Sequence, residues 1–165
     1  HRIARRQRQM CIRDRQWLDA YGESHQNATN KLVHWVCVPA IMFSILGLLY
    51  CIPPIFAERT FLINWAAVAV IFTLLFYLRL SFNIFLGFIF IGGLMLWGNH
   101  ALAQTIGIGG LLSSSITMFV IAWIGQFLGH QIEGAKPSFL EDIQFLLIGP
   151  AWLLHFIYKK VGIHY

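Results

Sequence analysis

Long uncharged apolar runs divide this chain, and their length constrains its fold more than any other feature. The runs occupy residues 32–52, 61–78, 82–98 and 111–129. Each comes close to the ~20 residues that a helix needs to cross ~30 Å of hydrocarbon. Hydrophobic residues make up 58% of the sequence and charged residues only 12%. We therefore predict an all-α integral membrane protein, a bundle of four transmembrane helices surrounded by membrane lipid.

Short polar segments separate the runs. Residues 53–59, which include two prolines and a Glu-Arg pair, end the first run. Residues 79–81 form a very short link between the second and third runs, and residues 99–110 form the predicted link to the fourth. Proline, glycine and charged residues at these points are typical of helix ends and loops.

The last apolar segment, residues 145–160, differs from the four runs. Gly149-Pro150 interrupts it, and its whole apolar length of about fifteen residues is short for a crossing. It ends at Lys159 and Lys160, which the positive-inside rule places on the same side as the amino terminus. We therefore predict a re-entrant or interfacial helical segment here, with a fifth crossing as the alternative.

The basic character of the chain comes from its first fifteen residues. The net charge is +5, and residues 1–15 hold six arginines against one aspartate, so the remaining residues balance to zero. Nucleic-acid binding has no support outside this tail. We predict that residues 1–15 are a non-native or disordered tail, with a native basic cytoplasmic arm as the alternative. Residues 16–165 then form a single membrane-embedded domain.

The number of membrane crossings determines which potential metal-binding side chains lie on the same face of the membrane. With four crossings, the segment before the first helix and the segment after the fourth lie on one face of the membrane. His25, His34, His130 and Glu133 therefore share a face, which the positive-inside rule makes cytoplasmic. His100, at the far end of the third run, lies on the opposite face.

The shared face has the side chains of a metal site. Gln126, His130 and Glu133 follow each other at helical spacing, so they lie on one side of a helix. His25 and His34 are half a turn out of phase unless the helix begins between them, at the capping residues that separate them. Converging imidazoles and a carboxylate suit a divalent transition metal. The alternative is that each histidine is an interfacial hydrogen-bonding residue.

Two further features bear on this site. Gly125 and Gly129 lie near the Gln126–His130 stripe and would allow the close approach of a neighbouring helix or of a substrate. His155 lies in the broken last segment, where a re-entrant path would bring it toward the metal, or where it would bond to backbone groups near Gly149-Pro150.

Absent motifs exclude several enzyme classes. The sequence has no HExxH of zinc proteases and no GxSxG of esterases. The eight-histidine pattern of membrane di-iron desaturases is missing as well, so the histidines support a mononuclear metal at most.

Two segments resemble a known family. "SHQNATNKLVH" at 24–34, followed by "QFLGHQIEGAKP" at 126–137, is similar to the iron-dependent 2-hydroxy fatty acid dioxygenases of fatty acid α-oxidation, whose fungal member acts in phytosphingosine breakdown in the endoplasmic reticulum. The likeness extends over nearly the whole chain from Trp17. It implies that His25, His34 and His130 hold Fe(II) and that Glu133 occupies a recurrent acidic position. The family pattern has a carboxylate where this chain has His155, which puts a ligand role there in doubt.

The resemblance implies an oxidation of 2-hydroxy fatty acids by O₂ to acids one carbon shorter, as part of sphingoid-base and lipid catabolism. It implies a site on the cytoplasmic face of the endoplasmic reticulum membrane in a eukaryote, or of the inner membrane in a bacterium. Residues expected to contact the substrate are Asn27, Asn30, Lys31, Gln126 and Lys136. The alternatives are a zinc-dependent membrane lipid hydrolase and a non-enzymatic membrane scaffold or lipid-binding protein.

Overall fold

The computed structural model describes residues 28–55 and 58–133. Within these residues the order of elements is α2 (Ala28–Cys51), α3 (Trp65–Leu80) and α4 (Phe82–Glu133), with no strand among them. The predicted all-α fold is therefore confirmed for the part of the chain that the structure describes. The predicted tail at 1–15 and the predicted re-entrant segment at 145–160 lie outside it.

Helix α2 follows the first apolar run closely. It covers 24 residues and contains Pro39, and it ends at Cys51, just before Pro53-Pro54, as the sequence predicts. The Arg59 guanidinium then donates to the Cys51 carbonyl oxygen at 3.1 Å, which satisfies one of the carbonyl groups that a helix end leaves open.

Helix α3 begins four residues later than the predicted run at 61–78, because Asn64 caps it. The Asn64 side-chain oxygen accepts the backbone N–H of Ala67 at 2.8 Å, which satisfies one of the donors exposed at a helix start. At its other end only Ser81, in an extended conformation, separates α3 from α4. The predicted short link is therefore confirmed.

Helix α4 corrects the prediction of a link at 99–110. Its 52 residues combine the third and fourth apolar runs, and the only non-helical residue inside is Gly107, with φ 73° and ψ 172°. This backbone region is essentially restricted to glycine. One residue makes the turn, and the residues on both sides keep helical hydrogen bonds, because open backbone groups are costly in an apolar environment.

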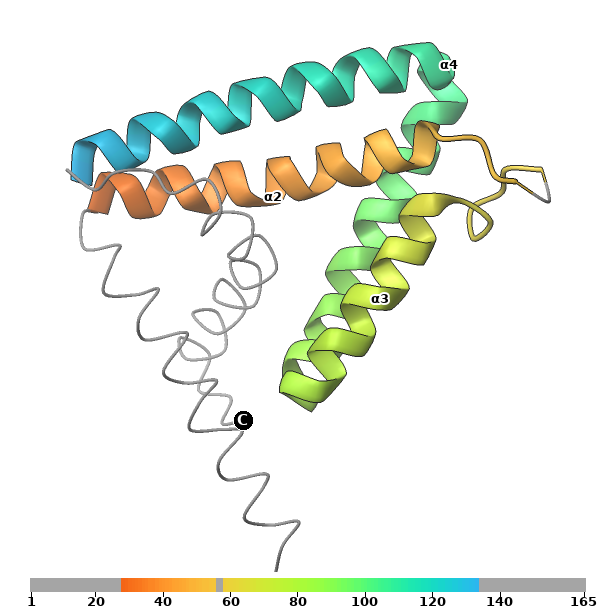
Figure 1. Ribbon diagram of the computed structural model, residues 1–165, viewed down its shortest axis with the longest axis horizontal. Coiled ribbons are helices and arrows are strands. Elements are labelled where there is room, and N and C mark those ends of the chain that lie inside the picture. Colours follow the sequence, from red (N-terminus) through yellow and green to blue (C-terminus); the bar gives the residue numbers. More distant parts are fainter. Residues whose placement is uncertain (1–27, 56–57, 134–165) are drawn as a thin grey trace, which may run out of the picture.

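The kink divides the molecule into two helical pairs. In Figure 1, α3 lies beside the part of α4 before Gly107, and α2 lies beside the part after it. Specific contacts agree with this view: Gly92 faces Val70 of α3, and Gly125 faces Cys37 of α2. The two pairs diverge from a common end near the kink (Figure 1).

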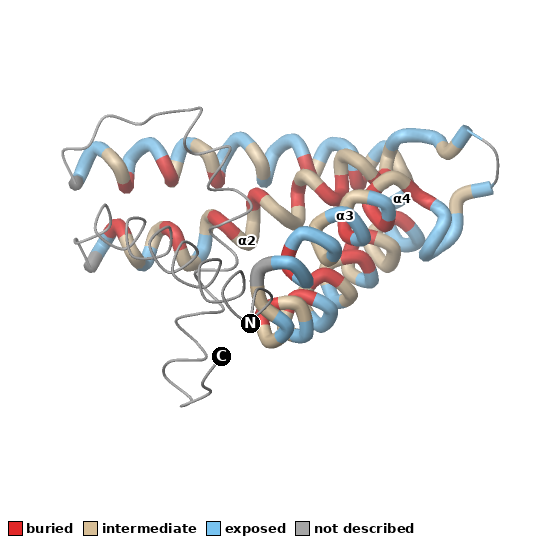
Figure 2. Tube along the Cα trace, turned by 60° about the horizontal axis from the view of Figure 1, so that its bottom comes forward, coloured by how far each residue is buried: buried red, intermediate tan, exposed pale blue. Residues whose placement is uncertain are grey.

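The core lies where the two pairs meet. A buried cluster there joins Leu46 and Tyr50 of α2, Val70 of α3, and Leu96 and Leu111 from the two parts of α4. Figure 2 shows buried residues along the facing sides of the helices, and exposed residues along their outer sides. The outer sides carry many exposed large apolar side chains, which is unusual for a protein surrounded by water.

Two described helical stretches are long and apolar enough to cross a membrane, Thr29–Cys51 and Phe82–Ile132. Helix α3 has 16 residues, fewer than the ~20 that a perpendicular crossing needs. The four separate transmembrane helices predicted from the sequence therefore stay a prediction, although all four apolar runs are helical over most of their length.

Candidate metal centre

The first turns of α2 orient the His34 ring. His34 is only 3% exposed, and its Nδ1 lies 3.0 Å from the carbonyl oxygen of Asn30, one helical turn earlier. A carbonyl oxygen can only accept, so Nδ1 carries the proton and donates. The neutral ring then has its lone pair on Nε2. Metal-binding histidines commonly have this arrangement, with one ring nitrogen held by a carbonyl and the other available as ligand.

Helix α4 brings a second imidazole to the same place. The rings of His34 and His130 meet edge to face, with their centroids 5.2 Å apart. The sequence predicts that these two histidines share a face of the membrane, and the structure brings them together although they come from opposite ends of the described chain. Their role as metal ligands stays a prediction.

Glycines allow this close approach of the two helices. A side-chain carbon added at Gly129 would overlap the Asn30 side-chain oxygen, and one at Gly125 would come within 2.7 Å of the Cys37 sulfur. The predicted role of Gly125 and Gly129 is therefore confirmed. Because Asn30 is fully buried in this contact and its carbonyl holds His34, packing at Gly129 is coupled to the orientation of the imidazole.

Gln126 lies one helical turn before His130. Its side chain is 7% exposed, and its amide oxygen is buried without a hydrogen-bond partner among the described residues. Lys31, another predicted substrate contact, is half-buried in the first turn of α2. The structure therefore places Gln126 and Lys31 in the same end of the α2–α4 pair as the two histidines.

Other predicted site residues are not described. His25, Asn27, Lys136 and His155 lie outside the described residues, and of Glu133 only the backbone, at the end of α4, is described. Among residues 28–55 and 58–133 no group of three or more His, Cys, Asp or Glu side chains is placed to hold a metal ion. The predicted ligand set of His25, His34 and His130 therefore stays a prediction, and His25 belongs to the undescribed part.

A second polar cluster lies at the other end of α2. The Tyr50 hydroxyl lies 2.8 Å from Nδ1 of His100, and the Arg59 guanidinium lies over the Tyr50 ring at 5.6 Å. Tyr50 follows His34 by sixteen residues of one helix, about 24 Å. His100 is therefore remote from the histidine pair, as predicted. No local sequence pattern links Tyr50 and Arg59 to His100, because only the fold brings them together.

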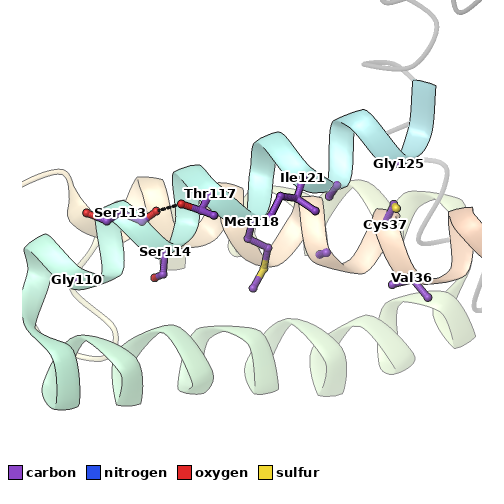
Figure 3. Close-up of a pocket in the computed structure, with 11 residues that line it drawn as sticks. Val36, Cys37, Gly110, Ser113, Ser114, Thr117, Met118, Ile121 and Gly125 are labelled. Atoms are coloured by element: carbon purple, nitrogen blue, oxygen red, sulfur yellow. Dashed lines mark hydrogen bonds between the residues drawn. The ribbon is translucent and has the colours of Figure 1, made fainter. Parts of the chain in front are cut away.

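An open groove of about 760 Å³ also lies along α2 and α4 (Figure 3), but it does not contain the histidines. Ile121 lines it, and the nine residues from Ile121 to His130 turn the helix by about 900°, which places them on opposite sides of α4. The hydroxyl of Thr117 in the groove donates to the Ser113 carbonyl at 2.9 Å. The groove wall is thus mostly apolar, and neither histidine lines it.

Comparisons with known proteins agree on one family. A family model described as "2-hydroxy-palmitic acid dioxygenase Mpo1-like" matches residues 13–161. The chain is 28% identical over 150 residues to the 2-hydroxy-palmitic acid dioxygenase of Saccharomyces cerevisiae, an alignment that covers 90% of this chain and 81% of the yeast protein. No solved structure matches the chain.

Proposed function

The chain belongs to the Mpo1-like family, and we propose that it is an Fe(II)-dependent dioxygenase that shortens 2-hydroxy fatty acids by one carbon. The observation that carries the proposal is the meeting of His34 and His130, with ring centroids 5.2 Å apart, between two helices of apolar composition. The name of the yeast relative supports the substrate class and the reaction type.

The residues present fit a mononuclear iron. The hydrogen bond from Nδ1 of His34 to the Asn30 carbonyl leaves Nε2 as the basic nitrogen, and imidazole is a suitable ligand for Fe(II). His34 and His130 would hold the ion together with His25, the ligand expected from the sequence. Bound Fe(II) supplies the redox chemistry with O₂ that the protein's own side chains lack.

The reaction balances without a further co-substrate. One 2-hydroxy fatty acid and one O₂ give the fatty acid one carbon shorter, CO₂ and water. The bond between the first two carbons breaks, the substrate supplies all the electrons, and O₂ accepts them. The chain's task is to hold the polar end of the substrate at the histidines and to keep water out, which the burial of His34 (3% exposed) supports.

The substrate favours a membrane location for the enzyme, because its chain is apolar and only its head is polar. Exposed apolar side chains support this placement, among them Phe72 (68% exposed) and Phe90 (74% exposed). The histidine end then lies at the cytoplasmic boundary, in the endoplasmic reticulum of a eukaryote or the inner membrane of a bacterium. Lipid surrounds the outer sides of α3 and α4.

Oxygen consumption tests the proposal. The full chain, purified in detergent and reconstituted anaerobically with Fe(II), is given O₂ and 2-hydroxypalmitate, and the product is identified by mass. We expect O₂ uptake that depends on the substrate and a fifteen-carbon acid as product, with no uptake on palmitate. Iron-loaded protein that consumes no O₂ would contradict the proposal. Zinc-dependent cleavage of an ester- or amide-linked lipid that continues without O₂ would support the hydrolase alternative instead.

A further inference from the structure

The side-chain amide of Gln126 has an unsatisfied hydrogen-bond acceptor in the part of the chain that the structure describes. Its side chain is 7% exposed, and its oxygen is buried without a hydrogen-bond partner among the described residues. Buried polar atoms are almost always hydrogen-bonded, because a buried donor or acceptor without a partner costs about 1–3 kcal/mol. An acceptor without a described partner, on a helix that could carry an apolar side chain at the same position, is a candidate for a hydrogen bond from a ligand.

The position of Gln126 indicates which ligand. It precedes His130 by four residues, so the two side chains lie about 40° apart around α4, on the same side of the helix. Gln126 is not among the residues that line the groove between α2 and α4. Its amide is therefore beside the imidazole pair, where the polar end of a substrate would lie if the proposed function holds.

We infer that the amide oxygen of Gln126 accepts a hydrogen bond from the 2-hydroxyl group of the substrate, an inference that rests on the proposed function. An amide oxygen can only accept, and an ionised carboxylate can also only accept. The 2-hydroxyl is thus the one donor that a 2-hydroxy fatty acid offers near its head. Gln126 is then the residue that distinguishes 2-hydroxy acids from unsubstituted fatty acids.

The expected discrimination between 2-hydroxy and unsubstituted fatty acids follows from the burial of the Gln126 oxygen. An unsubstituted fatty acid would leave the Gln126 oxygen without a partner in a site that its own chain closes to water. Sites built around a hydrogen bond to a substrate hydroxyl reject the analogue that lacks it, for this reason. The contribution of one such hydrogen bond corresponds to about tenfold in binding.

Substrate binding without turnover tests the inference. Wild type, Gln126→Met and Gln104→Met are purified as full chains, loaded with Fe(II) and kept anaerobic, and the dissociation constants of 2-hydroxypalmitate and palmitate are measured. Methionine keeps the length of the side chain and removes the acceptor. Gln104 is exposed on the same helix, so Gln104→Met is the matched control. We expect Gln126→Met to lower the preference for the hydroxy acid about tenfold and Gln104→Met to leave it unchanged.

Thermal stability and iron content distinguish a Gln126 that binds substrate from one that is purely structural or belongs to the metal site. Gln126→Met removes an acceptor without a described partner, so the thermal midpoint should not fall, whereas a purely structural glutamine would make it fall. Loss of bound iron in Gln126→Met would assign the residue to the metal site and overturn the inference. An unchanged preference in an active enzyme would overturn it too, while leaving the proposed function intact.

A second binding measurement uses only wild type and does not depend on the Gln126→Met variant. In wild type, 2-methoxypalmitate replaces the hydroxyl proton with a methyl group, so it should bind about tenfold more weakly than 2-hydroxypalmitate. Equal binding of the two acids would overturn the inference even if Gln126→Met does not fold. Failure of wild type to oxidise 2-hydroxypalmitate at all would contradict the proposed function first.

Discussion

Histidines lie near both ends of α2, but their partners differ. At one end, imidazoles from two helices face each other, and a backbone carbonyl holds the proton of His34. At the other end, His100 pairs with the phenol of Tyr50 at 2.8 Å and lies against the Phe61 ring. The first arrangement brings two imidazoles from different helices together, and the second uses the ring to join helix α4 to α2. Under the proposed function, histidine binds a metal at the first end and supports the fold at the second.

Replacing histidines tests this comparison with the largest expected effect. We expect His34→Ala and His130→Ala each to lower the rate of 2-hydroxypalmitate oxidation by at least about 100-fold, because each removes a proposed metal ligand. Mutating a residue that only positions a metal ligand already costs about 10–100-fold in metal affinity or activity. His100→Ala should keep near wild-type turnover at saturating iron. The rate is measured as substrate-dependent O₂ uptake. Full activity in either of the first two variants, or equal losses in all three, would remove the distinction between the ends.

Glycine substitutions test the packing that brings the imidazoles together. Gly129→Ala would put a methyl group against the buried Asn30 side chain, so we expect a loss of about 1–3 kcal/mol in unfolding free energy and a loss of activity. Gly109→Ala is the matched control, because a side-chain carbon there has no neighbour within 4 Å, and alanine in a helix stabilises by up to about 1 kcal/mol. Thermal unfolding in detergent measures both. A neutral Gly129→Ala would show that the helices separate easily at the site.

The smallest effect is expected at the structural end. Tyr50→Phe removes the hydroxyl that pairs with His100 and should cost about 1 kcal/mol of stability. Turnover should stay near that of wild type, because Tyr50 lies about 24 Å from His34 along α2. Thermal unfolding and O₂ uptake on the same preparation check both statements. A large loss of activity without a loss of stability would place the Tyr50–His100 pair in the reaction.

Local patterns in the sequence predict much of this architecture. Prolines after Cys51 mark the end of α2, and the glycine spacing on α4 indicates a close helix contact before its partner is known. The meeting of His34 and His130 follows from counting helices rather than from any local signal. The link predicted at 99–110 is wrong because its glycines and polar residues resemble a loop, while an apolar environment favours a continuous helix with one turn at Gly107.

Other features depend on tertiary contacts that no local pattern contains. The burial of Asn30 against Gly129 joins residues from different helices, and so does the Tyr50–His100 pair. Asn30 is one of the residues that the sequence predicts as substrate contacts. In the structure it is fully buried, and its carbonyl orients His34. Only the packed helices distinguish a residue that meets the substrate from one that positions a ligand.

The most direct test of the histidine site is the amount of iron bound per chain. Wild type, His34→Ala, His130→Ala and His100→Ala are purified anaerobically, loaded with Fe(II), freed of excess ion and analysed for iron. The account predicts about one iron per chain in wild type and His100→Ala, and little iron in His34→Ala and His130→Ala. Stoichiometric iron in His34→Ala and His130→Ala would contradict it and place the metal elsewhere in the chain.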